Sequence, residues 1–117
     1  VPPIEGGRLL LRRVTFASGS AEIDPESAIV LDVAAGEILE RTAVRIRVEG
    51  YTDGVGGAES NQVLAQRRAE AVRRYLVRKG VAPQRLETSA RGAASPVAPN
   101  ETEAGRARNR RVELVVL

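Results

Sequence analysis

The stretch of residues 44–49 constrains the fold more than any other feature of this chain, because apolar and charged side chains alternate in it without a break. A period of two places one row of side chains on each face of a β-strand. Here valine and isoleucine form one row, and arginine and glutamate form the other. The pattern therefore predicts a strand with one buried face and one solvent-exposed face.

Two stretches with helical spacing flank this strand. The first begins at Asp24-Pro25, which is typical of an N-cap followed by proline in the first helical position. Apolar residues then recur at intervals of three and four residues as far as Leu39. The second stretch covers residues 61–79, and Gly80 has the character of a C-terminal cap. We expect a helix over each stretch.

Three further strands are expected at residues 8–16, 85–91 and 111–116, and residues 92–105 are expected to form a long loop. The order of elements is then β-α-β-α-β-β. Strands that alternate with helices imply parallel pairs, and the last strand indicates a mixed sheet. Because the second and last strands carry charged rows, the helices are expected on one face only. The predicted fold is α+β, a two-layer sandwich with a mixed four-stranded sheet.

The length of 117 residues corresponds to one domain. Residues 1–13 are assigned to an N-terminal arm and the start of the first strand, and residues 14–117 to the domain itself. No apolar run approaches the roughly 20 residues that a membrane span needs. The chain starts at Val1 rather than Met, so we expect a domain excised from a longer protein, with any targeting or anchoring segment outside it.

The chain contains no histidine and no cysteine, and this excludes several kinds of site. Ser-His-Asp and Cys-His catalysis, disulfide frameworks and the usual zinc sites all need one or both residues. The composition therefore predicts a binding protein rather than an enzyme, without catalytic residues, cofactor or metal. A hydrolase that uses carboxylates alone is the remaining enzymatic alternative, but only Glu49 and Glu59 lie near Asp53 in the sequence.

Asp53 and Arg68 are the candidate site residues that stand out by their positions. Asp53 follows the strand at residues 44–49 within a glycine-rich loop, and ligands bind at such strand ends in open α/β sheets. Arg68 lies four residues from both Leu64 and Val72, so it shares the apolar stripe of its helix. A buried arginine needs a partner. Either it forms a salt bridge with a carboxylate such as Asp53, or the two residues flank a ligand that carries a carboxylate and an amine.

Two other readings involve phosphate-bearing ligands. The loop at residues 54–59 matches a dinucleotide-binding fingerprint only in part, because Glu59 occupies the third glycine position. A basic cluster near the C-terminus could contact nucleic acid, although no aromatic residues are interleaved to stack on bases. The alternative is that the cluster lies where a loop joins the last strand. Its arginines would then pair with nearby glutamates, and one of them would reach the candidate site. The cluster comprises Arg106, Arg108, Arg110 and Arg111.

Several short motifs, taken in their order and spacing, are similar to those of one known family. They are the segment GYTDGVG at residues 50–56, Asn61, Leu64, Arg68-Ala69 and the segment GRARNRRVE at residues 105–113. Residues 16–21, Pro96 and Asn100 fit the same pattern. Together they resemble the OmpA-like peptidoglycan-binding domain, which has relatives in the Pal lipoprotein and the MotB flagellar stator protein. The resemblance runs from about Val14 to Val116.

The resemblance implies a periplasmic domain that binds the peptide stem of peptidoglycan non-covalently, through diaminopimelate. In the family, the Asp of a Gly-His-Thr-Asp motif holds the ammonium group and the Arg of a Leu-Ser-x-x-Arg-Ala motif holds the carboxylate. These match Asp53 and Arg68. The family also uses the residues that correspond to Asn61 and Thr52. Its Asn-Arg-Arg motif offers one further arginine, for which Arg111 is the expected match.

The resemblance also implies partners and a setting. The parent protein is expected to be anchored in the outer or inner membrane through a segment outside this chain, with possible envelope protein partners and no nucleic acid. An alternative is a protein-interaction module of an envelope complex that has the same fold and no wall binding. Tyr51 and Ala65 replace the family's His and Ser. We expect the first change to alter the rim of the pocket and the second to remove a hydrogen bond.

Overall fold

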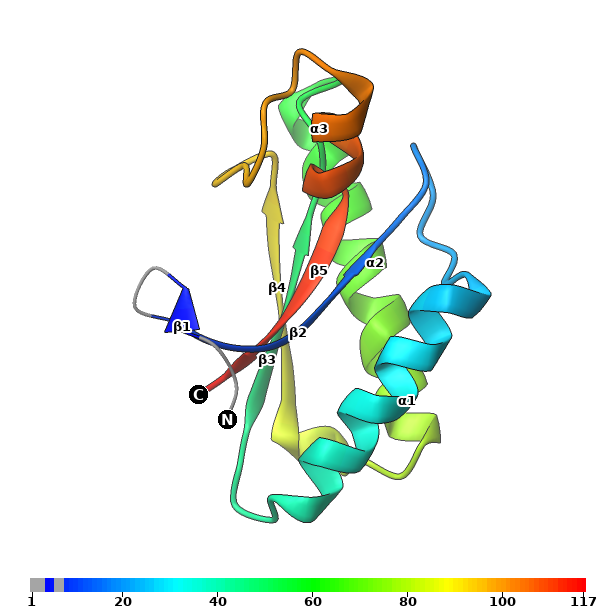
Figure 1. Cartoon of the computed structure of the whole chain (residues 1–117), viewed down its shortest axis with the longest axis vertical. Coiled ribbons are helices and arrows are strands. Elements are labelled where there is room, and N and C mark those ends of the chain that lie inside the picture. Colours follow the sequence, from blue (N-terminus) through cyan, green and yellow to red (C-terminus); the bar gives the residue numbers. More distant parts are fainter. Residues whose placement is uncertain (1–3, 6–7) are drawn as a thin grey trace.

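The computed structural model describes residues 4–5 and 8–117 (Figure 1). Most of the expected N-terminal arm, residues 1–3 and 6–7, lies outside the described residues. The elements in chain order are β1 (Ile4–Glu5), β2 (Arg8–Thr15), α1 (Pro25–Glu40), β3 (Ile46–Tyr51), α2 (Ala58–Arg78), a short 3-10 helix (Pro83–Arg85), β4 (Leu86–Gly92), α3 (Glu103–Asn109) and β5 (Arg111–Val116).

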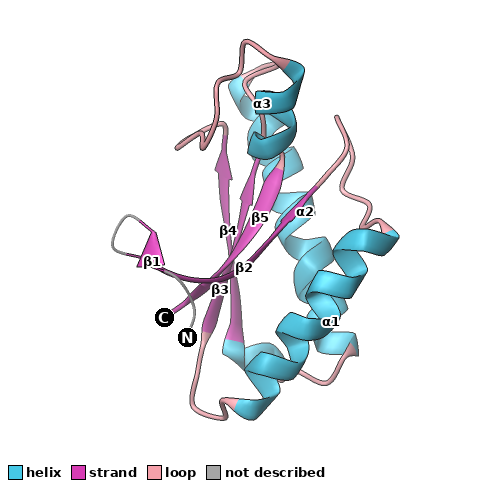
Figure 2. Ribbon diagram, in the orientation of Figure 1, coloured by secondary structure: helices cyan, strands magenta, loops and turns pink. Residues whose placement is uncertain are grey.

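The strands form one mixed sheet in the order β1-β2-β5-β3-β4. Strands β3 and β4 are parallel, and the other neighbours are antiparallel. Helices α1 and α2 pack on one face of this sheet, while α3 lies at one end of it (Figure 2). The predicted α+β two-layer sandwich is therefore confirmed. The two-residue strand β1 adds a short edge to the four strands expected from the sequence.

The local signals predict the start of α1 correctly, but α2 begins at Ala58 rather than at residue 61, and α3 was not expected. The Asp24 carboxylate accepts a hydrogen bond from the Ser27 N–H at 2.7 Å, as expected of an N-cap. The prediction of a loop throughout residues 92–105 is wrong at its end, because α3 begins at Glu103. The side chain of Thr102 caps this helix by accepting from the Gly105 N–H. A helix of seven residues is too short to show a periodic apolar pattern.

The core lies between the sheet and the two long helices. It is built from aliphatic side chains with one aromatic ring, as the low aromatic content requires. Its fully buried members include Leu31, Ile38, Ile46, Val48, Val72, Leu76 and Leu114. Helix α2 also contributes Arg68 to this side of the sheet, so the most deeply buried cation of the helix borders the core.

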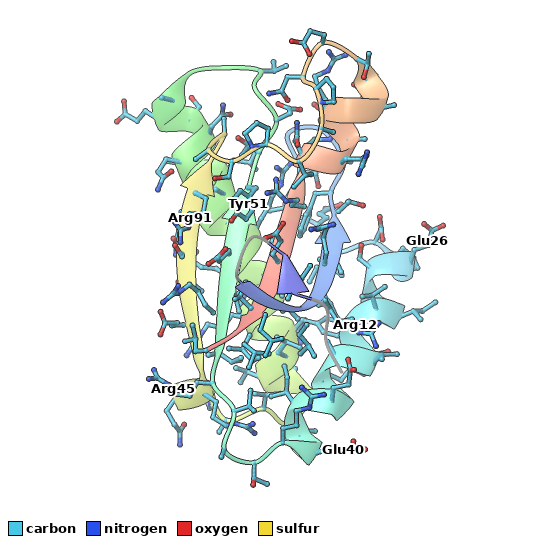
Figure 3. The ribbon with its side chains drawn as sticks, turned by 60° about the vertical axis from the view of Figure 1, so that its left-hand side comes forward. Arg12, Glu26, Glu40, Arg45, Tyr51 and Arg91 are labelled. Atoms are coloured by element: carbon cyan, nitrogen blue, oxygen red, sulfur yellow. The ribbon has the colours of Figure 1, made fainter. Side chains whose placement is uncertain are left out.

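The opposite face of the sheet corrects part of the expectation that the charged rows are solvated: Arg45 is exposed and Arg47 half-buried, but the rest of the two rows is buried. Glu49, Tyr51, Arg111 and Glu113 are each at most 2% exposed. Arg111 Nε donates to Glu113 Oε2 at 2.7 Å, its guanidinium lies 3.7 Å from the centre of the Tyr51 ring, and Tyr51 Oη donates to Glu49. Figures 1 and 3 show β1 on this side of the sheet, away from the helices. These charges are compensated within the sheet: Arg111 pairs with Glu113 along β5, and Glu113 and Glu49 also pair with Arg13 of β2 and Arg91 of β4.

No helix among the described residues has the length and apolar character that crossing a membrane requires.

Candidate functional site

A hollow of about 220 Å³ opens where the carboxyl end of β3, the start of α2 and the entry to β5 meet. In Figure 1 these segments gather at the end of the sheet that carries α3. Four polar or charged residues in its lining, besides two serines, are Asp53, Asn61, Arg68 and Arg110. Three of the five predicted site residues are thus brought together, whereas Thr52 and Arg111 do not line the hollow.

Arg68 is fully buried, and backbone carbonyls fix its guanidinium. Its Nε donates to Ser20 O at 2.8 Å, its Nη1 to Tyr51 O at 3.0 Å and its Nη2 to Ala17 O at 3.0 Å. These contacts tie the loop after β2 to the end of β3. Three of the five N–H groups of a guanidinium are used in this way, which leaves two. Within residues 4–5 and 8–117, no carboxylate lies within ion-pair distance of Arg68.

The charge of Arg68 persists despite its burial. Desolvation lowers the pKa of Arg68 to about 10, with the negative charge of Asp53 acting to raise it and the positive charge of Arg110 acting to lower it. A guanidinium with this pKa is protonated at neutral pH. A buried cation without a directly bound carboxylate is costly, so this side of the hollow favours an anionic group.

Asp53 pairs with Arg110 rather than with Arg68. Its Oδ2 accepts from Arg110 Nη1 at 3.2 Å, and its Oδ1 accepts from the Val55 N–H at 3.0 Å. Arg110 also donates to Glu103 Oε1 at 2.7 Å and to Phe16 O at 3.0 Å. Burial acts to lower the pKa of Arg110, but the hydrogen bonds to Glu103 and Asp53 outweigh it and raise the pKa. The salt bridge between Arg68 and Asp53, one of the two sequence interpretations, is therefore not formed.

Thr52 and Asn61 have different relations to the hollow. Asn61 lies in the first turns of α2, is 7% exposed and contributes to the lining. Thr52 is buried beneath it, where its Oγ1 donates to Asp53 O at 2.9 Å and its N–H donates to Gly92 O at 2.7 Å. Thr52 thus holds the backbone that carries the Asp53 carboxylate.

Arg111 lies on the face of the sheet away from the helices, so the structure does not bring it to the hollow. It donates to Glu113 and, at 2.9 Å, to Ser95 O. Arg110, one residue earlier, occupies the expected place of the further arginine. The alternation along β5 could have indicated this, because side chains two residues apart lie on the same face of a strand. Arg111 therefore shares a face with Glu113, and Arg110 shares the face of the core residue Val112.

A fully buried asparagine that the sequence did not single out supports the rim of the hollow. Asn109 Oδ1 accepts from the N–H groups of Val97 and Ala98, at 2.8 and 3.1 Å. Its Nδ2 donates to Asn100 Oδ1 at 2.8 Å, and the same oxygen accepts from the Gly54 N–H at 3.2 Å. The end of α3 is thereby linked to the turn next to Asp53.

The hollow therefore presents two guanidinium groups and one carboxylate on a preformed frame. Among residues 4–5 and 8–117, no group of three or more His, Cys, Asp or Glu side chains could hold a metal ion. The two guanidinium groups and the one carboxylate leave the hollow with an excess of one positive charge. Such a hollow suits a ligand that carries an anionic group and an ammonium group close together.

The fold and the hollow together define a small α+β domain with a charged recess at one end of its sheet. The chain belongs to the OmpA family, whose family model matches residues 15–110. The resemblance found in the sequence is thereby confirmed. The assignment of residues 14–117 to this domain stays a prediction.

Relatives of known sequence and structure agree with this membership. The chain is 44% identical over 107 residues to the peptidoglycan-associated lipoprotein of Pseudomonas aeruginosa, covering 89% of this chain and 63% of that protein. It is 41% identical over 103 residues to the probable lipoprotein YiaD of Escherichia coli, covering 88% and 47%. The chain thus spans about half to two thirds of these curated relatives. The crystal structure of the peptidoglycan-associated lipoprotein from Burkholderia pseudomallei superposes with a TM-score of 0.87 at 36% identity, covering 91% of this chain and 90% of that one.

Proposed function

We propose that this domain binds peptidoglycan non-covalently through the diaminopimelate of its stem peptide. The observation that carries the proposal is Arg68, a buried and protonated guanidinium that has two unused N–H groups and no bound carboxylate, beside Asp53 in one hollow. By binding the wall, the domain would anchor the envelope protein of which it is part. The name of the Pseudomonas aeruginosa relative, a peptidoglycan-associated lipoprotein, supports the same ligand.

Diaminopimelate fits this hollow chemically because its side chain carries an amine and a carboxylate on one carbon. The carboxylate would accept from the two unused N–H groups of Arg68, in a charge-assisted contact. The ammonium group would donate to Asp53, whose two oxygens each keep acceptor capacity beyond their present hydrogen bond. Asn61 would add an amide contact from α2, and Thr52 would keep the Asp53 backbone in place.

We further propose a non-catalytic role in the periplasm, with a membrane reached only through a segment outside this chain. A hydrogen bond to a charged group contributes roughly 1.5–3 kcal/mol, and association costs consume part of the sum. One domain on one peptide would then bind modestly. Because the wall is a polymer, several tethered copies would gain by avidity.

Wall material of two compositions tests this proposal. Peptidoglycan with diaminopimelate is expected to sediment the domain, whereas peptidoglycan with lysine at that position is expected to leave most of it in the supernatant. Lysine has the amine but lacks the carboxylate that Arg68 would bind. Equal binding to both materials would indicate general electrostatic adhesion. Binding to neither would favour the protein-interaction module on the same fold.

The two consecutive arginines before and within β5 are expected to respond differently to substitution. Arg110→Ala removes a cation of the hollow and the partner that orients Asp53, so affinity for the wall should fall about tenfold. Arg111→Met removes the closer of two arginine partners of Glu113 on the other face, the second being Arg13, together with the contact of the guanidinium with the Tyr51 ring, so the free energy of unfolding should fall by about 3 kcal/mol. Binding isotherms and urea denaturation measure the two effects. If Arg111→Met folds but binds the wall weakly, while Arg110→Ala binds as the wild type does, this assignment is contradicted.

A further inference from the structure

A second hollow lies on the outer face of α2, directly beside the first. It has a volume of about 490 Å³ and is lined by Gly19, Glu59, Ser60, Val63, Leu64 and Arg67. Gly19, Ser60 and Leu64 belong to the lining of both hollows. The two hollows therefore adjoin, and a ligand seated at Asp53 and Arg68 would reach the second hollow by extending past these three residues.

Arg67 differs from the other cations of its helix near the site. It is exposed and forms no hydrogen bond or ion pair within the described part of the chain. By contrast, Arg68 is held by three carbonyl groups, and Arg73 donates to Leu86 O and Pro83 O. The Arg67 guanidinium is thus available to a ligand, next to Val63, which is 49% exposed and offers apolar contact.

We propose that this second hollow is a subsite of the same binding site, in which Arg67 binds a second carboxylate of the same acidic peptide. The proposal rests on the proposed function. Successive residues of an α-helix point about 100° apart, so Arg67 and Arg68 direct their guanidinium groups into different compartments. A peptide with two carboxylates in neighbouring residues would engage both arginines, and Arg67 can bind such a group through two N–H groups.

Glu59 lies in the same lining, so the subsite contains one negative group beside the positive group of Arg67. It too has no ion pair within the described residues. A ligand carboxylate bound by Arg67 would be repelled by Glu59 across the hollow. Replacing Glu59 with glutamine should therefore tighten binding of the peptide about twofold to threefold, whereas a site for an ammonium group would respond in the opposite direction.

Titration calorimetry with a soluble stem peptide that contains diaminopimelate tests the subsite. Arg67→Ala is expected to weaken binding five- to tenfold. The matched control is Arg74→Ala, which removes the same charge about 10 Å further along α2, at another exposed arginine without an ion pair in the described part of the chain. This variant should change affinity less than twofold. Equal losses in both variants would overturn the subsite in favour of general electrostatic attraction.

Two modified peptides identify the source of the second carboxylate. One is amidated at the acidic residue before diaminopimelate, and the other is amidated at its C-terminus. The peptide that lacks the relevant carboxylate should bind the wild-type domain and the Arg67→Ala variant equally. If both modified peptides still discriminate the two proteins, the subsite is overturned. Asp53→Asn is measured in parallel. If Asp53→Asn loses binding and Arg67→Ala does not change it, the subsite is refuted and the proposed function stands. If Asp53→Asn binds as the wild type does, the proposed function itself is refuted.

Discussion

Replacing Asp53 with asparagine is expected to abolish cosedimentation of the domain with diaminopimelate-type peptidoglycan while the fold persists. Asparagine keeps the size of the side chain and an oxygen that can accept from the Val55 N–H. It removes the negative charge that would hold the ligand ammonium group. Loss of a charge-assisted hydrogen bond of roughly 1.5–3 kcal/mol reduces a modest affinity about tenfold to a hundredfold. Sedimentation and circular dichroism measure binding and folding on the same sample.

Arg68 is expected to show the same loss of binding, but its substitution needs a different design. The side chain is fully buried and donates to three backbone carbonyls, so Arg68→Ala would create a cavity and leave these carbonyls without a donor. Arg68→Lys keeps the charge and most of the volume but loses the planar fork. It should bind weakly and unfold at a lower temperature.

Arg45→Ala is the control for charge, because Arg45 is an exposed cation at the opposite end of β3. It should sediment with the wall as the wild-type domain does. Wild-type binding by Asp53→Asn, with Arg45→Ala also unchanged, would show that the hollow is not the binding site.

The sequence predicted those parts of the fold that depend on periodicity. The alternation at residues 44–49 located β3, and the cap at Asp24 located the start of α1. Arg68 was recognisable because a charged residue on an apolar stripe is unusual, and Asp53 because it follows a strand in a glycine-rich loop. That these two residues line one hollow follows from the order of β3 and α2 along the chain.

The parts that the sequence did not predict depend on pairing between distant residues. Glu49 and Glu113 are buried with arginine partners on other strands, Arg91 and Arg13, and nothing in the local pattern shows that such charges will compensate one another. For the same reason, the sequence could not say whether Asp53 pairs with Arg68 or with Arg110. Which of the two contacts forms depends on where the segment between α3 and β5 places Arg110.

The fold shows where the two departures from the family pattern, Tyr51 and Ala65, lie. Tyr51 was expected to alter the rim of the pocket, but its ring lies on the far face of the sheet, against Arg111. Only its backbone carbonyl reaches Arg68. Ala65 is fully buried, and its backbone lies directly against Gly50 of β3. The residue at position 65 therefore packs where the backbone of α2 lies directly against β3.

That close approach leads to a second large effect, on stability. In Gly50→Ala, the new Cβ would lie 2.0 Å from the carbonyl oxygen of Ala65 and 2.9 Å from its carbonyl carbon. Both atoms are backbone atoms within α2, so no side-chain rotation relieves the clash. The helix must move away from β3, and the free energy of unfolding should fall by about 3 kcal/mol or more, a large share of the stability of a small domain. Urea denaturation measures the change.

Gly36→Ala is the matched control for this substitution. Gly36 lies within α1, is exposed, and has no atom within 4 Å of the position that a Cβ would take. Alanine there should raise the free energy of unfolding by up to about 1 kcal/mol, because glycine is a poor helix former. The same chemical change is thus expected to act in opposite directions at the two positions. Because the displaced α2 also carries Arg68, Gly50→Ala should weaken wall binding, whereas Gly36→Ala should not. If both variants denature at the urea concentration of the wild type, α2 does not pack this closely on β3 in solution.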